Sequence, residues 1–315
     1  MLRADPIVLL GPTATGKSEI GIHLARRLGG RIISADSMQV YRGLDAGTCK
    51  PSAEARREIP HELIDVADPV EAFSAGRFAR LAMEAIDRTV RAGLTPIVVG
   101  GTGLYIRALL SGIAPIPARD EAVRRRLYEK ARRSGAASLH QDLAAVDPST
   151  AARLGPNDLQ RVVRALEVME LTGIPLSGHI QASAFRPEAL PALKVGLRMD
   201  RELLDRRIED RVDRIFELGI VDEVRRILAT GVPPEANAFK ALGYREVIGH
   251  LRGEIGLDEA IALVKTNTRR YARRQLQWFR REPGVHWLDA GGARGRPEPL
   301  VEAIVELHRA HGCRG

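Results

Sequence analysis

The sequence predicts an α/β fold, in which a parallel β-sheet carries helices on both faces and a helical domain is inserted into the chain. Within the first 110 residues, β-rich segments alternate with helical ones, the pattern of successive β-α-β units. From Arg119 to about Gly178, by contrast, only helical patterns occur. Hydrophobic residues make up 44% of the 315 residues, which is enough for a sizeable core.

Four β-rich segments in the first 100 residues are expected to form the sheet. Helical spacing between them predicts helices over Lys17–Leu28 and Ser74–Arg91, each followed closely by glycine. Ligands of parallel sheets bind beyond the carboxyl ends of the strands. Three of these ends carry the segments GPTATGKS, ADSMQ and GGTGLY, which are polar or rich in glycine. The expected strands are residues 7–10, 31–34, 61–66 and 96–99.

The helical insertion is expected to cover residues 118–185. A break rich in proline precedes it, at residues 113–117, and strand character returns after it, at Leu193–Met199. Residues 1–117 and 186–315 are therefore expected to form the α/β core with its C-terminal helices. In this last part only Val285–Leu288 has the character of a strand.

The clearest helix of the insertion is predicted to begin at Asn157, with Gln160 three residues later as in a capping box. Gly173 is expected to end it. Arg161 and Arg164 project from a different face than the apolar residues. The apolar stripe consists of Leu159, Val162, Val163, Leu166 and Met169.

The overall composition indicates an intracellular protein with an anionic partner. The formal net charge is +8 and the pI is near 9.9, which makes a polyanionic partner plausible. No apolar run reaches the length of a membrane span, and the N-terminus has no cleavage site of a signal peptide. Cys49 and Cys313 match no metal-binding spacing, so we expect reduced thiols and a cytoplasmic location. No extended apolar stripe demands a second subunit, and a monomer is expected.

The segment GPTATGKS fits the phosphate-binding pattern G-x-x-x-x-G-K-[ST] in full. It stands after a predicted strand and before a predicted helix, as this loop must, and it predicts a P-loop NTPase-like core. Backbone amides of such a loop wrap phosphate oxygens, the lysine bridges phosphates, and the hydroxyl after the lysine helps to hold Mg²⁺. The loop consists of Gly11, Pro12, Thr13, Ala14, Thr15, Gly16, Lys17 and Ser18.

Asp36 and Thr102 follow two other predicted strands. Asp36 could be a ligand of Mg²⁺ or a general base, and its alternative role is that of a turn or helix N-cap residue. The Thr102 hydroxyl could donate to an anion, whereas the alternative for GGTGLY is a tight turn without a ligand. No hydrophobic run ends in Asp-Glu, the second acidic motif expected of an enzyme that hydrolyses nucleoside triphosphates.

The segment from Lys265 to Arg281 contains seven cations, three aromatic residues and no acid. Such a cluster on a helix is typical of a surface that binds the backbone of a nucleic acid. The alternative is a solvated basic face with its aromatic residues in the core. Two groups of residues fall on neighbouring faces, Arg270, Arg273, Arg274 and Arg281 on one, and Tyr271, Gln275 and Trp278 on the other.

Taken together, the motifs resemble those of the tRNA dimethylallyltransferases, also called tRNA isopentenylpyrophosphate transferases. The resemblance runs from about Ile7 to Leu288, and two positions depart from it: Gln277 in place of threonine and Cys49 in place of alanine. The motifs, in chain order, are GPTATGKS, ISADSMQVYRGLDAGTCKP, PHELIDV, VVGGTGLYIRALL, NDLQRVVRALEV, RRIEDRVDRI, ALGYREV and TRRYARRQLQWFRR.

The resemblance implies a reaction and its catalytic residues. Members of the family transfer a dimethylallyl group from its pyrophosphate to N6 of adenine 37, beside the anticodon, in tRNAs that read codons starting with U. Mg²⁺ is the implied cofactor, and the P-loop holds the pyrophosphate of the prenyl donor. Asp36 is the implied general base, and Thr102 and Arg211 contact the pyrophosphate, with Arg207 as a lesser candidate.

The resemblance also implies which residues contact the anticodon stem-loop of the tRNA. They come from the segment after the second strand, from the insertion and from the C-terminal helices. They are Asp36, Ser37, Met38, Gln39, Thr102, Arg124, Gln160, Arg161, Val162, Val163, Arg164, Tyr244, Arg245, Arg273, Arg274 and Arg280.

Three other functions are compatible with part of these motifs. An adenylate prenyltransferase acting on free nucleotide would have no use for the insertion or the basic helix. A small-molecule kinase would use ATP at the same loop, and it also leaves the basic helix without a role. A non-catalytic RNA-binding protein would not need Lys17, Ser18, Asp36 and Thr102 intact.

Overall fold

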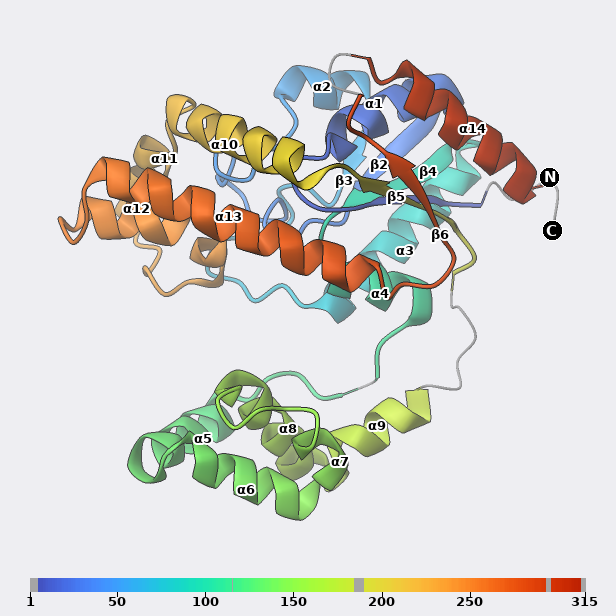
Figure 1. Ribbon diagram of the computed structural model, residues 1–315. Helices are drawn as coiled ribbons and strands as arrows, with labels where there is room; N and C mark the ends of the chain where they lie inside the picture. The colour runs from blue at the N-terminus through green and yellow to red at the C-terminus, as the bar shows by residue number, and fades with distance from the viewer. Residues whose placement is uncertain (1–4, 115, 184–189, 293–295, 313–315) are drawn as a thin grey trace. The chain divides into compact units, whose positions relative to one another are not determined.

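The computed structural model describes residues 5–114, 116–183, 190–292 and 296–312 (Figure 1). The chain divides into two compact units, the larger formed by residues 1–110 and 190–315 and the smaller by residues 111–189. The smaller unit thus begins before residue 118. The expected boundary between residues 185 and 186 lies outside the described residues, as does Cys313.

A parallel sheet of six strands forms the centre of the larger unit. Every residue of β1 and β4 is buried, as expected of parallel strands that are covered on both faces. This confirms the predicted fold class. The order across the sheet is β3 (His61–Glu62), β2 (Gly30–Ser34), β4 (Thr95–Gly100), β1 (Ile7–Leu10), β5 (Leu193–Arg198) and β6 (Val285–Asp289).

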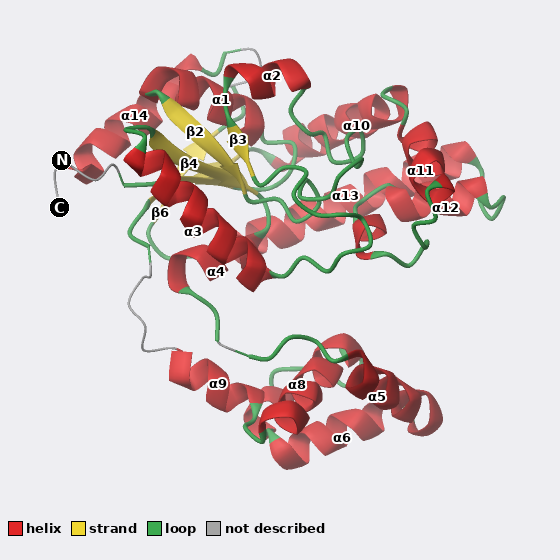
Figure 2. Ribbon diagram, turned by 180° about the vertical axis from the view of Figure 1, so that it is seen from behind, coloured by secondary structure: helices red, strands yellow, loops and turns green. Residues whose placement is uncertain are grey.

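Helices cover both faces of this sheet (Figure 2). On one face, α3 (Ala75–Arg91) and α4 (Gly103–Ser111) bury side chains such as Phe78 against the strands. On the other face, α1 (Lys17–Leu28) and α14 (Glu298–Gly312) do the same. The helix predicted over residues 17–28 has the predicted bounds, and its glycine C-cap, Gly29, adopts the left-handed conformation.

The third strand is much shorter than predicted, because β3 ends at Glu62. Leu63 and Asp65 have φ values of 63° and 58°, a left-handed conformation that no strand can contain. The turn is held in place by Asp65, whose carboxylate contacts Lys50 at 2.5 Å and Arg56 at 2.7 Å. The prediction of a strand over residues 61–66 is therefore wrong after its second residue.

A layer of helices follows β5 and extends from the sheet (Figure 1). Its longest member, α13 (Leu257–Phe279), contains most of the basic segment and lies alongside α10 (Arg201–Glu217). None of the helices in the described ranges is long and apolar enough to cross a membrane. The other elements in the larger unit are α2 (Ala53–Glu58), α11 (Ile220–Ala229), the short 3-10 helix Asn237–Lys240 and α12 (Tyr244–Leu251).

Three ion pairs join α10 to α13, and we call them the α10–α13 ladder. Lys265 contacts Asp213 at 2.7 Å, Arg269 contacts Glu209 at 2.7 Å, and Arg273 lies 3.8 Å from Asp205. The three cations on α13 and the three acids on α10 each recur every four residues, the spacing that places side chains in a row along a helix. The basic segment has no acid in its own sequence, but α10 neutralises one side of it.

The smaller unit is a cluster of helices. Its core is formed by apolar residues that include Leu139, Leu143 and Val162. The predicted capping box at Asn157 is wrong: α8 begins at Leu159, and its N-cap residue Asp158 makes no side-chain cap. The helices are α5 (Glu121–Ser134), α6 (Ala136–Val146), α7 (Pro148–Ala151), α8 (Leu159–Thr172) and α9 (Leu176–Ser183).

Candidate active site

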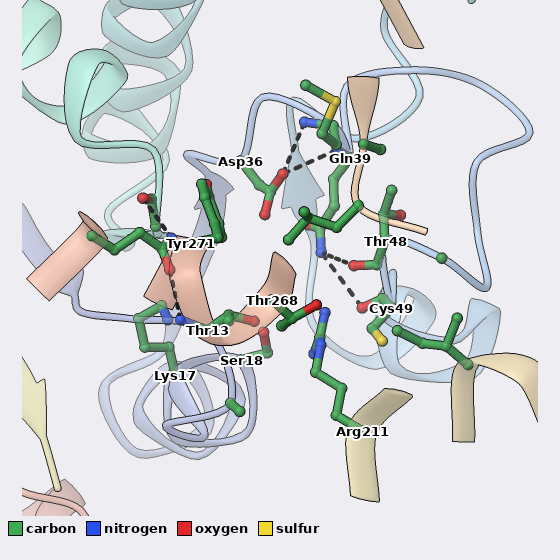
Figure 3. Close-up of a pocket in the computed structure, with 18 of the residues that line it drawn as sticks. Thr13, Lys17, Ser18, Asp36, Gln39, Thr48, Cys49, Arg211, Thr268 and Tyr271 are labelled. Carbon is green, nitrogen blue, oxygen red and sulfur yellow. Dashed lines mark hydrogen bonds between the residues drawn. The ribbon is translucent and has the colours of Figure 1, made fainter. Parts of the chain in front are cut away.

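A cavity of about 670 Å³ opens in the larger unit, at the carboxyl ends of β1, β2 and β4 (Figure 3). The loop after β1, residues 36–39 after β2, and Gly100 and Gly101 at the end of β4 all contribute to its lining. Further walls come from residues 47–49, from α10 and from α13. The three segments that the sequence singled out therefore meet in one site.

The loop from Gly11 to Ser18 has the geometry of an anion cradle. Gly11, Ala14 and Gly16 have φ values of 143°, 64° and 88°, so residues of positive φ alternate with others, as in the backbone concavities that bind anions. A side chain at Gly11 would lie 2.6 Å from the carbonyl oxygen of Leu197, which only glycine avoids. The loop ends at the N-terminus of α1, where the helix dipole adds positive potential.

Lys17 is held at the wall of this cavity (Figure 3). Its ammonium group donates to the carbonyl oxygen of Pro12 at 2.5 Å. The pKa of Lys17 is lowered from 10.5 to about 7, first by burial and then by the cation of Arg211, while the Asp36 carboxylate opposes both effects. An anion bound beside Lys17 would restore the full charge of the lysine, so the loop gains a cation when its ligand arrives.

Cations dominate the cavity. Arg207, Arg211, Arg214 and Arg274 line it together with Lys17. These cations outnumber the acids of the lining, which are Glu19, Asp36 and Asp210, and a concave site with an excess of one charge concentrates ligands of the opposite sign. The site is therefore suited to a polyanion larger than a single phosphate group.

Asp36 is the second residue after β2, and it also lines the cavity. One oxygen of its carboxylate accepts the backbone N–H of Met38 at 2.8 Å and, more weakly, that of Gln39 at 3.4 Å. The second oxygen has no hydrogen-bond partner among the described residues. Asp36 therefore fills the turn role and also offers a free carboxylate oxygen to the cavity, which Figure 3 shows.

The ends of β2 and β4 are tied together by Thr102. Its hydroxyl oxygen accepts the backbone N–H of Ser37 at 3.0 Å, and it lies 3.3 Å from the Ser37 hydroxyl. Gly100 permits this approach, since a side chain there would lie 2.2 Å from the carbonyl oxygen of Ala35. Thr102 thereby fixes the segment that carries Asp36, a contribution the sequence did not predict.

The wall formed by residues 45–49 is held from behind by Glu223 of α11. This buried carboxylate accepts the backbone N–H groups of Asp45 and Ala46 at 2.8 and 2.7 Å, and that of Gly47 at 3.4 Å. It also accepts the hydroxyl of Tyr244 at 2.6 Å. A side chain on Gly47 would collide with the Tyr244 ring, so glycine is required at this position.

Gln275 and Tyr271 of α13 also line the cavity, although neither was among the predicted site residues. The Gln275 carboxamide bonds both the P-loop and Gly101. Burial raises the pKa of the Tyr271 phenol, and the nearby Asp36 carboxylate raises it further. The sequence did place Gln275 and Tyr271 on one helical face. That spacing could have identified them as site residues, because this face of α13 packs toward the P-loop and not toward solvent.

Several residues expected to contact tRNA have no exposed side chain. Val162, Val163 and Tyr244 are completely buried, which corrects the expectation that these side chains reach RNA. Arg124 is only 8% exposed, and its guanidinium contacts Glu167 at 3.2 Å. Arg164 contacts the same carboxylate at 2.8 Å.

Other residues of this group do present their side chains to solvent. Arg161 is exposed, and so is Gln160 beside it. Arg273 is half exposed, but it faces Asp205 in the α10–α13 ladder. In the described part of the chain, Arg245, Arg274 and Arg280 are exposed and form no ion pair.

Comparisons with known proteins agree with this geometry. A family model described as IPP transferase matches residues 39–282, and a second, described as isopentenyl transferase, matches residues 5–68. The chain belongs to the IPP transferase family. It is 51% identical, over 91% of its length, to a tRNA dimethylallyltransferase of Geobacter metallireducens, and the match covers 93% of that relative.

A second relative and two solved structures extend the family assignment. A tRNA dimethylallyltransferase of Desulforudis audaxviator is 50% identical over 95% of this chain and 97% of its own. The tRNA isopentenylpyrophosphate transferase of Bacillus halodurans superposes with a TM-score of 0.71 at 37% identity, covering 98% of both chains. A eukaryotic dimethylallyltransferase acting on tRNA superposes with a TM-score of 0.78 at 28% identity, covering 96% of this chain and 78% of its own.

Proposed function

We propose that this IPP transferase family member transfers a dimethylallyl group from dimethylallyl pyrophosphate to N6 of adenine 37 in tRNAs that read codons starting with U. The products are N6-dimethylallyladenosine and pyrophosphate. One observation carries the proposal: the P-loop and the free oxygen of Asp36 line one cavity, which offers an anion site and a proton acceptor together. The family relatives favour this reaction over a kinase or an adenylate prenyltransferase.

The donor end of the reaction is the P-loop. When the allylic C–O bond breaks, its electron pair stays on the pyrophosphate, and negative charge grows there. Lys17, the loop amides and Arg211 are placed around the cavity to stabilise this charge where it develops. Stabilisation that increases toward the transition state is what accelerates the chemical step.

The acceptor end is Asp36. The N6 amine of adenine is a weak nucleophile, because its lone pair is delocalised into the ring. The free carboxylate oxygen of Asp36 takes the N6 proton while the new C–N bond forms, and such general bases contribute about 100- to 10,000-fold to the rate. Adenine 37 must leave the stack of the anticodon loop to reach this oxygen, which costs a few kcal/mol.

Mg²⁺ is the proposed cofactor, and the Ser18 hydroxyl in the cavity lining would hold it beside the bound pyrophosphate. Mg²⁺ commonly takes one or two protein oxygen ligands and completes its shell with phosphate oxygens and water, so a hydroxyl beside a diphosphate site suits it. When bound, the ion would supply further positive charge for the leaving pyrophosphate.

The tRNA is proposed to bind through exposed cations of both units. In the smaller unit these are Arg161 with its neighbour Gln160, and in the larger unit Arg245, Arg274 and Arg280. Phosphate contacts of this kind position the RNA, while the cavity selects the adenine. The reaction takes place in the cytoplasm with the protein as a monomer, in our proposal.

The function is tested by incubating the purified protein with dimethylallyl pyrophosphate, Mg²⁺ and unmodified tRNA. Nucleosides released by digestion are then analysed by mass. We expect adenosine to gain the mass of one C5H8 unit, only with the prenyl donor and not with ATP in its place. Transfer of phosphate from ATP, or prenylation of free AMP but not of tRNA, would establish one of the alternatives.

The α10–α13 ladder predicts which arginines of the basic helix bind tRNA. Arg270 and Arg274 are one helical turn apart, exposed, and without an ion pair in the described residues. Replacing both with alanine should raise the KM for tRNA at least about tenfold and lower the slope of log affinity against log salt by about 2, or one counterion for each arginine. Because Arg274 also lines the cavity, the KM for dimethylallyl pyrophosphate is measured in parallel with Arg270→Ala alone, where it should stay near the wild-type value.

Arg269 is the matched control on the same helix. It faces α10 and contacts Glu209 at 2.7 Å, so it has no free charge to offer a phosphate. Arg269→Ala should leave the salt slope as it is in the wild type. A loss of slope of about 1 in Arg269→Ala, the same loss per arginine as in the double variant, would show that charge on α13 acts through the overall field and not through contacts. Thermal unfolding of each variant excludes a folding defect.

The lowered pKa of Lys17 predicts that the protein takes up a proton when pyrophosphate binds. This pKa of about 7 in the free site must rise when the anion binds, so the complex at pH 8 takes up a proton that the free lysine lacks. Calorimetry of pyrophosphate binding in two buffers of different ionisation enthalpy measures this uptake. At pH 8 the wild type should take up more protons than Lys17→Ala, by at most about one. Equal uptake by the two proteins would contradict the assignment.

The same group has a consequence for stability. In the unfolded chain Lys17 regains its ordinary pKa of 10.5, so between pH 7 and 10.5 the unfolded state holds more protons than the folded one. The contribution of Lys17 to the stability of the ligand-free protein therefore rises with pH across this window. Bound pyrophosphate raises the pKa of Lys17 in the folded protein toward its value in the unfolded chain. It should therefore remove most of the change in stability with pH that Lys17 causes.

A further inference from the structure

Gln275 connects α13 to both glycine-rich loops of the donor site. Its side-chain oxygen accepts the backbone N–H of Thr13 at 2.9 Å, and its side-chain nitrogen donates to the carbonyl oxygen of Gly101 at 2.8 Å. The residue is 7% exposed, so both bonds are shielded from water. A carboxamide with both ends bonded to backbone groups in a buried place is firmly fixed.

The first of these bonds removes one amide from the phosphate cradle. Thr13 is the third residue of the loop, and its N–H is directed at Gln275. The amides from Ala14 onward, next to the N-terminus of α1, remain for the ligand together with Lys17. The end of the loop near Thr13 therefore has one donor fewer than the loop could offer.

The second bond shows that the carboxamide fills the space between the two loops. A side chain built on Gly101 would lie 2.3 Å from the Gln275 nitrogen, so glycine is required for the carboxamide to fit. A further phosphate group at this end would have to displace Gln275. It would then meet the carbonyl oxygen of Gly101, an acceptor that repels phosphate oxygens.

We infer that Gln275 sets the number of phosphate groups that the P-loop accepts: it admits a diphosphate and excludes a triphosphate. The inference rests on the proposed donor site and adds a residue that determines its specificity. Two observations support it: the Thr13 N–H already donates to Gln275, and the Gln275 carboxamide occupies the space beside Gly101. A loop of a type that commonly binds nucleoside triphosphates thereby becomes selective for a prenyl diphosphate.

The test compares the binding of inorganic pyrophosphate and inorganic tripolyphosphate by calorimetry, at fixed pH with Mg²⁺ present. These probes carry no prenyl group or nucleoside, so they report the length of the phosphate chain alone. We expect the wild type to prefer pyrophosphate at least about tenfold. Gln275→Ala frees the Thr13 amide and opens the space, and it should reduce this preference at least about fivefold.

Gln277→Ala is the matched control, since Gln277 is an exposed glutamine of the same helix. It should keep the wild-type preference. Gln275→Asn shortens the side chain by one methylene, cannot reach both partners, and should shift the preference in the same direction as alanine. This milder variant carries the test if Gln275→Ala does not fold.

Two results would overturn the inference. One is a wild type that binds tripolyphosphate as tightly as pyrophosphate. The other is a loss of affinity for both probes by the same factor in Gln275→Ala and Gln275→Asn, which would make Gln275 a brace for the loop without a role in selectivity. A wild type that binds neither probe would instead refute the donor site of the proposed function, so the two failures are distinguishable.

Discussion

Asp36→Asn should lower the turnover of prenyl transfer at least about 100-fold, while the affinity for tRNA stays within about twofold of the wild type. Asparagine keeps an oxygen that can accept the Met38 amide, so the turn after β2 is preserved. The second position becomes an NH₂ group, which cannot take a proton from N6. Single-turnover rates with saturating tRNA and dimethylallyl pyrophosphate measure the chemical step.

Two further variants test whether the loss of rate comes from the missing proton acceptor at Asp36. Asp36→Ala also removes the acceptor of the Met38 and Gln39 amides, so it should lose thermal stability as well as rate. Glu54→Gln changes an exposed carboxylate in the first turn of α2, which does not line the cavity, and should leave the rate within about threefold. Near wild-type turnover in Asp36→Asn would remove Asp36 from the mechanism as its general base.

Lys17→Ala should lower kcat/KM for dimethylallyl pyrophosphate by about 100-fold or more, because the leaving pyrophosphate loses a donor at the point where its charge grows. Both KM and kcat should change, since the anion is charged before and during the reaction. The measurement is the initial rate over a range of donor concentrations at saturating tRNA.

Binding of tRNA separates loss of the donor site from loss of the fold. Lys17→Ala removes an amine from a cavity wall, and the affinity for tRNA, measured without the prenyl donor, should remain near the wild-type value. Removal of a buried cation also relieves its desolvation, so thermal stability at pH 7 should not fall. If kcat/KM for the donor is unchanged while tRNA binding weakens, Lys17 belongs to the RNA site and not to the donor site.

The sequence alone predicted the parts of the fold that depend on local pattern. The P-loop lies between β1 and α1 with the predicted bounds, because its glycines and the strand before it are encoded within twenty residues. The strand after the insertion was also found, as β5. By contrast, the predicted third strand ends after two residues, since a left-handed turn held by Lys50 and Arg56 is not visible as a pattern.

The burial and ion pairing of residues in the predicted RNA surface could not be read from the sequence, for a different reason. Whether an arginine is free depends on which helix packs beside it, and this is a property of tertiary structure. Arg273 looks unpaired in its own segment, but Asp205 comes from a helix more than sixty residues earlier. Arg124 meets Glu167 in the same way, and Tyr244 meets Glu223. Partners so distant in sequence cannot be assigned from spacing.

The buried carboxylate of Glu223 determines how experiments on this protein at different salt concentrations should be interpreted. It holds the cavity wall at residues 45–49 through backbone amides and one tyrosine, and it forms no ion pair with any residue that the structure describes. Contacts of this kind, shielded from solvent, are screened far less by added ions than exposed ion pairs are. The wall should therefore keep its shape as the salt concentration is raised. A lower tRNA affinity at high salt then reflects weaker contacts between cations and phosphates, and not a distorted cavity.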